Sequence, residues 1–136
     1  GKFEISTSTG EPEGGNILFD VVAIDPQTAW AVGIDSYVIK TVDGGRTWQQ
    51  IKIDVPKTHL FCIYAGKKET ILIGGKGIFL SSADLGKTWK IPLFKPPITY
   101  DWIYGVSRRG DSGFVTVGRN GAVYLSSSTF WQKVSY

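Results

Sequence analysis

An eight-residue motif occurs twice in this chain and sets its length scale. The pattern Ser/Thr-x-Asp-x-Gly-x-Thr-Trp is formed by residues 41–48 and again by residues 82–89. A third tryptophan, Trp131, follows Trp89 after 42 residues, against 41 between the first two. A self-similar period of this length indicates a protein built from repeated supersecondary units. The members of the two copies are Thr41, Asp43, Gly45, Thr47 and Trp48, and Ser82, Asp84, Gly86, Thr88 and Trp89.

Other residues recur at nearly the same interval. Three glycines each lie eight residues before the start of a motif or of its third counterpart: Gly33, Gly74 and Gly118. Three apolar residues recur every 42 positions: Phe19, Phe61 and Ile103. The sequence therefore predicts a repeat domain over residues 17–136, with units at about 17–54, 58–94 and 100–136, preceded by an N-terminal segment, residues 1–16.

Each unit contains four short apolar segments separated by turn residues. In the first unit they are residues 19–24, 29–33, 37–42 and 48–53. These segments are rich in β-branched and aromatic residues, as strands are, and no stretch has the 3.6-residue apolar period of a helix. Short connections between sequential strands give an antiparallel meander, and a repeated four-stranded meander is a propeller blade. We predict an all-β chain of three four-stranded antiparallel propeller blades, which is half of a propeller.

The repeated motif carries a family resemblance. It is similar to the Asp-box of the bacterial neuraminidase repeat, and the wider unit resembles the photosystem II stability/assembly factor family of propellers over residues 17–134. The chain departs from that family at residues 126–131, where the third box has no Asp or Gly, and at Leu85, where the family usually carries Gly. The family also has about twice as many blades. The resemblance implies a factor that holds another polypeptide while a complex is assembled.

We expect the two complete boxes to have a structural role. An aspartate at this position of a hairpin accepts hydrogen bonds from backbone N–H groups of its own turn. Trp48 and Trp89 are then expected to pack between neighbouring blades. A calcium site at Asp43 or Asp84 would need further acidic ligands, and neither box contains one. The sequence therefore predicts no metal site at the boxes.

Three blades do not close a ring, since propellers have 4 to 8. Two solutions remain open. Two copies of the chain pair about a two-fold axis to form a homodimer with six blades, or the chain is a piece of a longer protein. Residues 2–8 alternate apolar and polar side chains as a half-buried strand does, and residues 9–16 have the composition of a flexible linker. Such a strand could complete the outer edge of a neighbouring blade.

Composition argues against several functions. Fifteen Lys and Arg against twelve Asp and Glu give a net charge of +3 that is spread along the chain, whereas nucleic-acid binders concentrate such charge. No run approaches the roughly 18 apolar residues of a membrane span. With one histidine, His59, and one cysteine, Cys62, the chain has neither a Ser/His/Asp set nor a zinc cluster. A sialidase-like reaction needs an arginine cluster and carboxylates that the inner strands lack. We predict a protein that is not an enzyme and uses no cofactor.

One face of the predicted blades collects cations and aromatic residues. It holds the loops between second and third strands together with the connectors between blades, and cations there outnumber acids. Aromatic and cationic groups dominate protein recognition, and a cationic surface attracts acidic partners. The sequence favours a scaffold with a protein partner of acidic character. The candidate binding residues are Lys57, His59, Lys76, Lys95, Tyr100, Trp102, Arg119 and Asn120.

Two other functions remain open beside the scaffold. One is a carbohydrate-binding or degenerate sialidase-like module, and the other is a purely structural oligomer. A sugar site should show a central pocket with exposed aromatic residues and a pair of carboxylates, whereas a scaffold should show a broad basic face. The chain has no methionine and opens on Gly1, which favours an exported protein over a cytoplasmic one.

Overall fold

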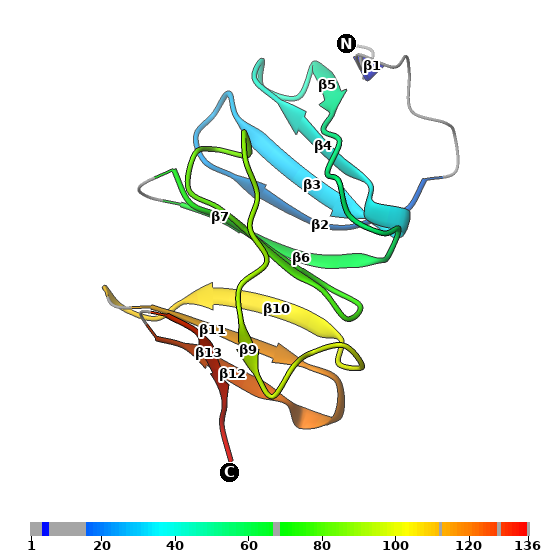
Figure 1. Ribbon diagram of the computed structural model, residues 1–136. Helices are drawn as coiled ribbons and strands as arrows, with labels where there is room; N and C mark the ends of the chain where they lie inside the picture. The colour runs from blue at the N-terminus through cyan, green and yellow to red at the C-terminus, as the bar shows by residue number, and fades with distance from the viewer. Residues whose placement is uncertain (1–3, 6–15, 67–68, 112, 128, 136) are drawn as a thin grey trace.

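The computed structural model describes residues 4–5, 16–66, 69–111, 113–127 and 129–135. These residues form three sheets that follow one another along the chain and stack face to face, with the first and third sheets at opposite ends of the stack (Figure 1). The first strands of the three sheets, β2 (Leu18–Ala23), β6 (Leu60–Ala65) and β10 (Ile103–Arg108), contact one another, and we call this side the inner edge. No helix in the described ranges is long and apolar enough to cross a membrane.

The first sheet is a meander with an added outer strand. After β2 come β3 (Ala29–Gly33), β4 (Val38–Thr41) and β5 (Thr47–Gln50), each antiparallel to the one before, with the 3-10 turn η1 (Ile34–Ser36) between β3 and β4. A fifth strand, β1 (Glu4–Ile5), pairs in parallel with β5. Part of the predicted N-terminal strand therefore completes the outer edge of its own sheet. The predicted linker, apart from Asn16, lies outside the described residues.

The second sheet has three full strands, β6, β7 (Ile71–Gly75) and β8 (Phe79–Ser82). The fourth strand that the sequence predicts is reduced to a single bridge between Ser81 and Lys90. The third sheet has β10, β11 (Phe114–Gly118), η2 (Arg119–Gly121), β12 (Val123–Ser126) and β13 (Trp131–Lys133). After the bridge the chain crosses to this third sheet, where β9 (Phe94–Lys95) pairs in parallel with β13 (Figure 1).

A proline explains why the fourth strand of the second sheet stops. In the first sheet the N–H of Ile51 donates to the carbonyl of Val38, and in the third sheet the N–H of Val134 donates to the carbonyl of Val123. Counted from the three tryptophans, Pro92 occupies the same position in the second sheet. Proline has no N–H to donate, so the pairing of the fourth strand ends one residue earlier in the second sheet than in the other two sheets.

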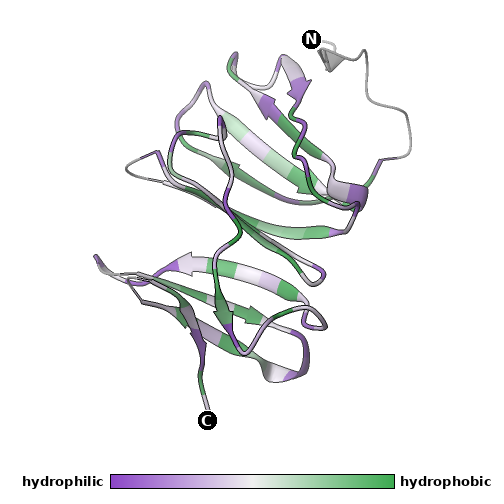
Figure 2. Cartoon of the chain, in the orientation of Figure 1, coloured by the Kyte–Doolittle hydropathy of each residue, from purple (hydrophilic) through white to green (hydrophobic). Residues whose placement is uncertain are grey.

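Two apolar cores hold the three sheets together, and the strands that face them are apolar along most of their length (Figure 2). We call the core between the first and second sheets the first seam and the core between the second and third the second seam. The first seam contains Trp30, Val32, Val38, Leu60, Ile63, Ile71, Ile73 and Leu80. The second contains Cys62, Leu72, Phe79, Phe94, Ile98, Ile103, Ala122, Tyr124 and Trp131.

The sheets at the two ends of the stack each leave one apolar face without a neighbouring sheet in the described part of the chain. On the first sheet this face has a small cluster around Ala31, Ile39 and Trp48, and Val21 beside it is 63% exposed. On the third sheet Val117 is 48% exposed. The residues of these faces occupy positions whose counterparts in the other sheets are covered in the two seams.

The strand register corrects two of the predicted intervals. Gly33 and Gly118 pair with the first residue of their inner strands, but in the second sheet that partner of Leu60 is Gly75, not Gly74. The reason is a shorter turn, because Gly75 bonds to the carbonyl three residues ahead, whereas the other two glycines bond four ahead. Each inner strand also has a bulge after its first residue, and the bulged residue is Phe19, Phe61 and Tyr104, not Ile103.

Candidate functional site

The first Asp-box turn is held by its own side chains. The carboxylate of Asp43 accepts hydrogen bonds from the N–H of Thr47 at 2.9 Å, from the hydroxyl of Thr47 at 2.6 Å and from the hydroxyl of Thr41 at 2.8 Å. Gly45, whose φ is 91°, donates its N–H to the hydroxyl oxygen of Thr41. The hydroxyl and N–H of Thr47, followed by the Thr41 hydroxyl, lower the pKa of Asp43 to about 2.

The second turn repeats this arrangement. Asp84 accepts the N–H and the hydroxyl of Thr88 at 2.9 and 2.6 Å and the hydroxyl of Ser82 at 2.8 Å. The Thr88 groups, followed by the Ser82 hydroxyl, lower the pKa of Asp84 to about 2. Leu85 has a φ of 57°, and Gly44 has a φ of 75° at the same place in the first turn, where glycine adopts a positive φ without strain. All the hydrogen bonds described for both carboxylates are made within their own turns.

The third turn lacks the aspartate and uses hydroxyl groups instead. Ser127 donates its hydroxyl to the carbonyl of Phe130 and accepts the N–H of the same residue. Ser126, at the position of Thr41 and Ser82, accepts the N–H of Phe114 from the neighbouring strand. The broken box therefore still forms a closed turn, but no carboxylate holds it.

On the opposite side of the sheets, three backbone hydrogen bonds repeat. The N–H of Lys76 donates to the carbonyl of His59, and the N–H of Arg119 donates to the carbonyl of Trp102, both at 2.9 Å. In the first sheet the same bond joins Ile34 to Ile17. A Cβ on Gly33, Gly75 or Gly118 would lie 1.9 to 2.2 Å from the carbonyl oxygen that accepts the bond, so only glycine fits there. These bonds fix each turn beside the residue that precedes the inner strand.

The bulged residues of the inner strands form a row of aromatic side chains. The rings of Phe19 and Phe61 lie 5.3 Å apart between centroids, and those of Phe61 and Tyr104 lie 5.1 Å apart. Trp102 stacks on Phe61 at 5.7 Å, and His59 lies 6.1 Å from the same ring. Phe19 and Tyr104 remain 44% and 46% exposed. An aromatic surface that is open to solvent along the inner edge is the kind of surface that binds a partner.

Two cations lie over this aromatic row. The ammonium of Lys76 and the guanidinium of Arg119 are each 5.0 Å from the ring centroid of Trp102. At this distance each cation is attracted by the π-system. We call Phe19, His59, Phe61, Lys76, Trp102, Tyr104 and Arg119 the central aromatic face. Its geometry fits a ligand that stacks on rings and carries negative charge.

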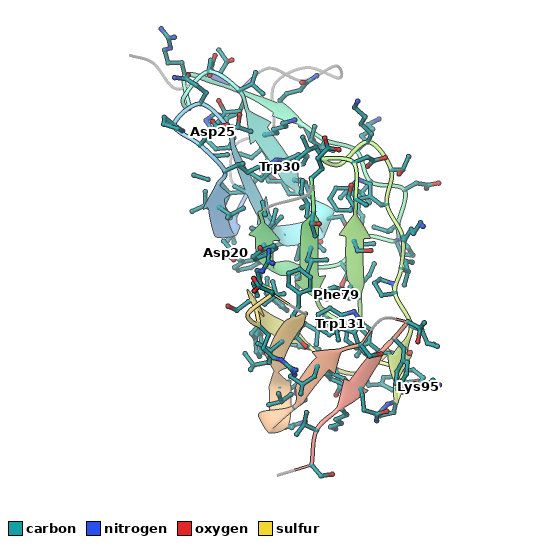
Figure 3. The ribbon with its side chains drawn as sticks, turned by 90° about the vertical axis from the view of Figure 1, so that its left-hand side faces the viewer. Asp20, Asp25, Trp30, Phe79, Lys95 and Trp131 are labelled. Atoms are coloured by element: carbon teal, nitrogen blue, oxygen red, sulfur yellow. The ribbon has the colours of Figure 1, made fainter. Side chains whose placement is uncertain are left out.

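The structure brings together four of the residues that the sequence proposes for binding, namely His59, Lys76, Trp102 and Arg119. It places Lys95 elsewhere, because β9 pairs with the outer strand β13 and the Lys95 ammonium lies 4.4 Å from the ring of Phe130. Lys95 therefore stands on the outer side of the molecule, opposite Asp20 of the inner edge (Figure 3). This location corrects the expectation that Lys95 belongs to the binding face.

The other proposed residues flank the face rather than form it. Asn120 is exposed at the η2 turn next to Arg119, Tyr100 is 89% exposed, and Lys57 lines a surface hollow beside the η1 turn. Phe19, Phe61 and Tyr104 were missed as site residues. Their signal in the sequence is the recurrence of aromatic residues at intervals of 42 and 43. In the third unit the exact interval of 42 instead selects Ile103, one residue before Tyr104.

Two titratable groups of the second seam are buried, Cys62 and Tyr124. Burial raises the pKa of the Cys62 thiol to about 12. The hydroxyl of Tyr124 donates to the carboxylate of Asp101 at 2.6 Å, and burial, followed by this carboxylate, raises the pKa of Tyr124. Among the described residues, no three His, Cys, Asp or Glu side chains lie close enough together to hold a metal ion.

The three sheets, their Asp-box turns and the aromatic inner edge define a repeat protein of the Asp-box propeller class. The chain belongs to the YCF48 family: the family model described as photosynthesis system II assembly factor YCF48 matches residues 9–133. It is similar to the chloroplastic photosystem II stability/assembly factor HCF136 of Arabidopsis thaliana, with 28% identity over 84% of this chain and 30% of the relative. The corresponding factor of Oryza sativa subsp. japonica is 26% identical over 84% of this chain and 29% of the relative.

Two solved structures share the fold. YCF48 bound to a D1 peptide matches with a TM-score of 0.72 and 23% identity over 87% of this chain and 39% of that one. YCF48 from Cyanidioschyzon merolae matches with a TM-score of 0.72 and 24% identity over 90% of this chain and 38% of that one. The chain thus spans about 30% of the length of the curated relatives that it matches.

Proposed function

We propose that the chain is a non-catalytic scaffold that binds a segment of a partner protein on the central aromatic face. The observation that carries this proposal is the exposed aromatic row with Lys76 and Arg119 over Trp102. Rings supply contact area at low entropic cost, and the two cations favour a segment with acidic groups. A relative of the same fold is bound to a D1 peptide, and the relatives are named as photosystem II assembly factors. We extend that role, assistance in assembling a complex, to this chain.

The test measures binding of a fluorescein-labelled D1 peptide by fluorescence anisotropy. Trp102→Ala should weaken binding at least about tenfold, as expected for a central aromatic contact. Lys76→Glu and Arg119→Glu should weaken it further with decreasing salt, because repulsion is then less screened. Lys95→Glu is the matched control, since it reverses the same charge on the outer side. Equal affinities of all four variants and the unsubstituted protein would contradict the proposal.

We propose in addition that two copies of the chain close a six-bladed ring, with each sheet acting as one blade. The face around Ala31, Ile39 and Trp48 at one end and the exposed Val117 at the other are the surfaces that a neighbouring blade would cover. Light scattering after size-exclusion chromatography should give a mass near twice 14.9 kDa. A stable monomer would overturn the dimer and favour closure by further blades of a longer polypeptide.

Exposed aromatic rings also support a second candidate, a carbohydrate-binding module, because sugars stack on such rings. A glycan array tests for sugar binding, and salt dependence separates the two candidates. Binding of a sugar should not depend on the salt concentration, whereas binding of the protein segment should. We also propose that the protein works outside the cytoplasm, as the chloroplastic relatives suggest. Fractionation of the source cells tests this location, and recovery in the cytoplasmic fraction would contradict it.

A further inference from the structure

The outer edges of the first and third sheets are each covered by a short parallel strand. In the first sheet Glu4 pairs with Thr47 and Ile5 pairs with Trp48. In the third sheet Phe94 pairs with Trp131 and Lys95 with Gln132. The added strands come from different places in the chain, but both put an apolar residue in register with the tryptophan at or near the start of the covered strand.

The contacts of β9 show what such a strand does for the tryptophan. The rings of Phe94 and Trp131 are stacked, with centroids 5.2 Å apart and planes 7° apart. The N–H of Trp131 donates to the carbonyl of Leu93 at 2.8 Å. Trp131 is only 5% exposed, and Trp48, on the strand that pairs with β1, is 8% exposed. The segment that includes β9 thus satisfies the backbone of the edge and covers the indole of Trp131.

The same edge of the second sheet has no such strand in the described part of the chain. Trp89 is only half-buried although its sheet lies in the middle of the stack, where burial should be greatest. Beyond it Ile91 is 68% exposed and Leu93 is 56% exposed. Because Pro92 has no N–H to donate, the chain beyond Lys90 does not continue to pair with β8, and its apolar side chains stay exposed to solvent. An uncovered edge with exposed apolar side chains is a template for pairing with another strand.

The indole N–H groups show the same difference. In the first sheet the Nε1 of Trp48 donates to the carbonyl of Gly45 at 3.1 Å. The Nε1 of Trp89 is buried and has no hydrogen-bond partner among the residues that the structure describes. A buried donor without a partner is unfavourable, and the ring of Trp89 lacks the hydrogen bond that holds the ring of Trp48 to its turn.

We propose that residues 89–91, together with the exposed side chain of Leu93, form a second docking site, which takes an extended segment of a partner protein as a parallel outer strand. This is β-strand addition to a sheet edge, in which main-chain hydrogen bonds give affinity and side chains give specificity. The site lies at the outer edge of the second sheet, whereas the central aromatic face lies at the inner edge, so the inference goes beyond the function proposed above.

The chemistry of the edge specifies the segment. An aliphatic or aromatic residue stacks on Trp89, as Phe94 does on Trp131. Acidic residues flank it, because Lys87 and Lys90 are both exposed on either side of Trp89. The step Glu4-Ile5, which pairs with the Thr-Trp step of the first sheet, already has this pattern. A hollow of about 310 Å³, whose walls include Ile91, Pro92 and Leu93, receives a further apolar side chain of the segment.

The probe is a fluorescein-labelled peptide, Glu-Phe-Glu-Ile-Ser-Thr-Ser, which carries the acidic-apolar step, and binding to the full chain is followed by anisotropy. Ile91→Asp should weaken binding at least about tenfold, which corresponds to 1.4 kcal/mol, by repelling the acidic groups. Val42→Asp is the matched control, because Val42 is 65% exposed in the first Asp-box turn, and it should change the affinity less than about twofold. Trp102→Ala should leave binding unchanged, so that this result is independent of the central aromatic face.

A second peptide tests the strand geometry. In a parallel pair, the residue after the one opposite Trp89 donates its N–H to the edge. Methylation of the backbone nitrogen of the first Ser should therefore abolish binding, and a photoreactive group in place of the peptide Ile should cross-link to residues 87–93. Absence of saturable binding at millimolar peptide, cross-linking to the inner edge, or an unchanged affinity of Ile91→Asp would each overturn the proposal. Cross-links between two copies of the chain that the peptide does not displace would assign the edge to self-association instead.

Discussion

The two seams are built on the same backbone positions but from different chemistry. The first seam is mostly aliphatic, with Trp30 and Trp89 meeting edge to face at 6.4 Å. The second is an aromatic cluster in which Phe79 lies 4.9 Å from Trp131 and 5.2 Å from Phe94. In Figure 3 Phe79 and Trp131 lie next to each other between the second and third sheets. The comparison shows that the repeat preserves where side chains meet, while their type is free to change.

One pair of equivalent positions makes the difference explicit. Asp20 and Cys62 each follow the bulge of their inner strand. The carboxylate of Asp20 crosses the first seam and accepts the N–H of Ile63 at 3.0 Å. The thiol of Cys62 lies in the second seam, 3.7 Å from the carbonyl of Gly74 and 3.8 Å from that of Ile103. The first seam thus contains a charged hydrogen bond where the second has only a weak thiol donor.

The largest expected effect is at the aromatic seam. Phe79→Ala should lower the free energy of unfolding by about 3–5 kcal/mol, because Phe79 is fully buried and its removal leaves a cavity. Urea denaturation followed by tryptophan fluorescence measures this change. Phe61→Ala is the matched control, since Phe61 is half-buried on the central aromatic face and should cost clearly less. A similar loss for both variants would mean that the second seam is not the dry core described here.

The second prediction concerns the carboxylate of the first seam. Asp20→Ala should lower the free energy of unfolding by about 1.5–3 kcal/mol, because the N–H of Ile63 loses a charged partner. The same urea experiment measures it. Asp111→Ala removes a carboxylate that is fully exposed and should have almost no effect. If Asp20→Ala were as mild as this control, the hydrogen bond across the seam would contribute nothing.

Much of this architecture could be predicted from the sequence because its period is strong. The Asp-box motif and the tryptophan interval place the hairpins, and the strand register differs from the predicted intervals by one residue. That single residue matters, since Gly75 rather than Gly74 lies against the backbone carbonyl that precedes the inner strand, and Tyr104 rather than Ile103 joins the aromatic row. Apolar neighbours such as Ile103 and Tyr104 both satisfy a periodic pattern, so only the bulge geometry separates them.

The crossing of β9 could not be predicted by the same reasoning. Phe94 is the last residue of the predicted second unit and Lys95 follows it, and nothing local assigns either residue to the outer edge of the third sheet. The pairing follows from Pro92, which ends the fourth strand, and from the stacking of Phe94 on Trp131. Lys95 was therefore assigned to the wrong side, whereas Lys76 and Arg119 follow the repeated turns and meet at Trp102.

The third prediction uses acid to distinguish the seams. The pKa of Asp43 and Asp84 is lowered from 3.8 to about 2, so both carboxylates stabilise the fold above pH 3.8, and this contribution is lost as the pH falls towards 2. The second box precedes Trp89 of the first seam, whereas the turn before Trp131 has no aspartate. Acid should therefore loosen the first seam before the second.

Hydrogen exchange with mass spectrometry measures this order between pH 5 and pH 2. Backbone amides of residues 82–90 should lose protection at higher pH than those of residues 126–133. Asp84→Asn should remove most of the pH dependence in the first segment and leave the second unchanged, because the amide does not titrate. Simultaneous loss of protection in both segments of the unsubstituted protein would show that the boxes do not set the acid stability of the seams.

The smallest effect is expected at Cys62, where the comparison concerns reactivity and not stability. Burial raises the pKa of this thiol to about 12, so at pH 8 almost none of it is thiolate, and the side chain is 2% exposed. Iodoacetamide at pH 8 should leave the native protein unmodified by mass spectrometry and should alkylate it rapidly in urea. Because the thiol lies between the second and third sheets, any alkylation without denaturant would report opening of the second seam. Phe79→Ala should then raise the alkylation rate, and Asp20→Ala, which acts on the other seam, should not.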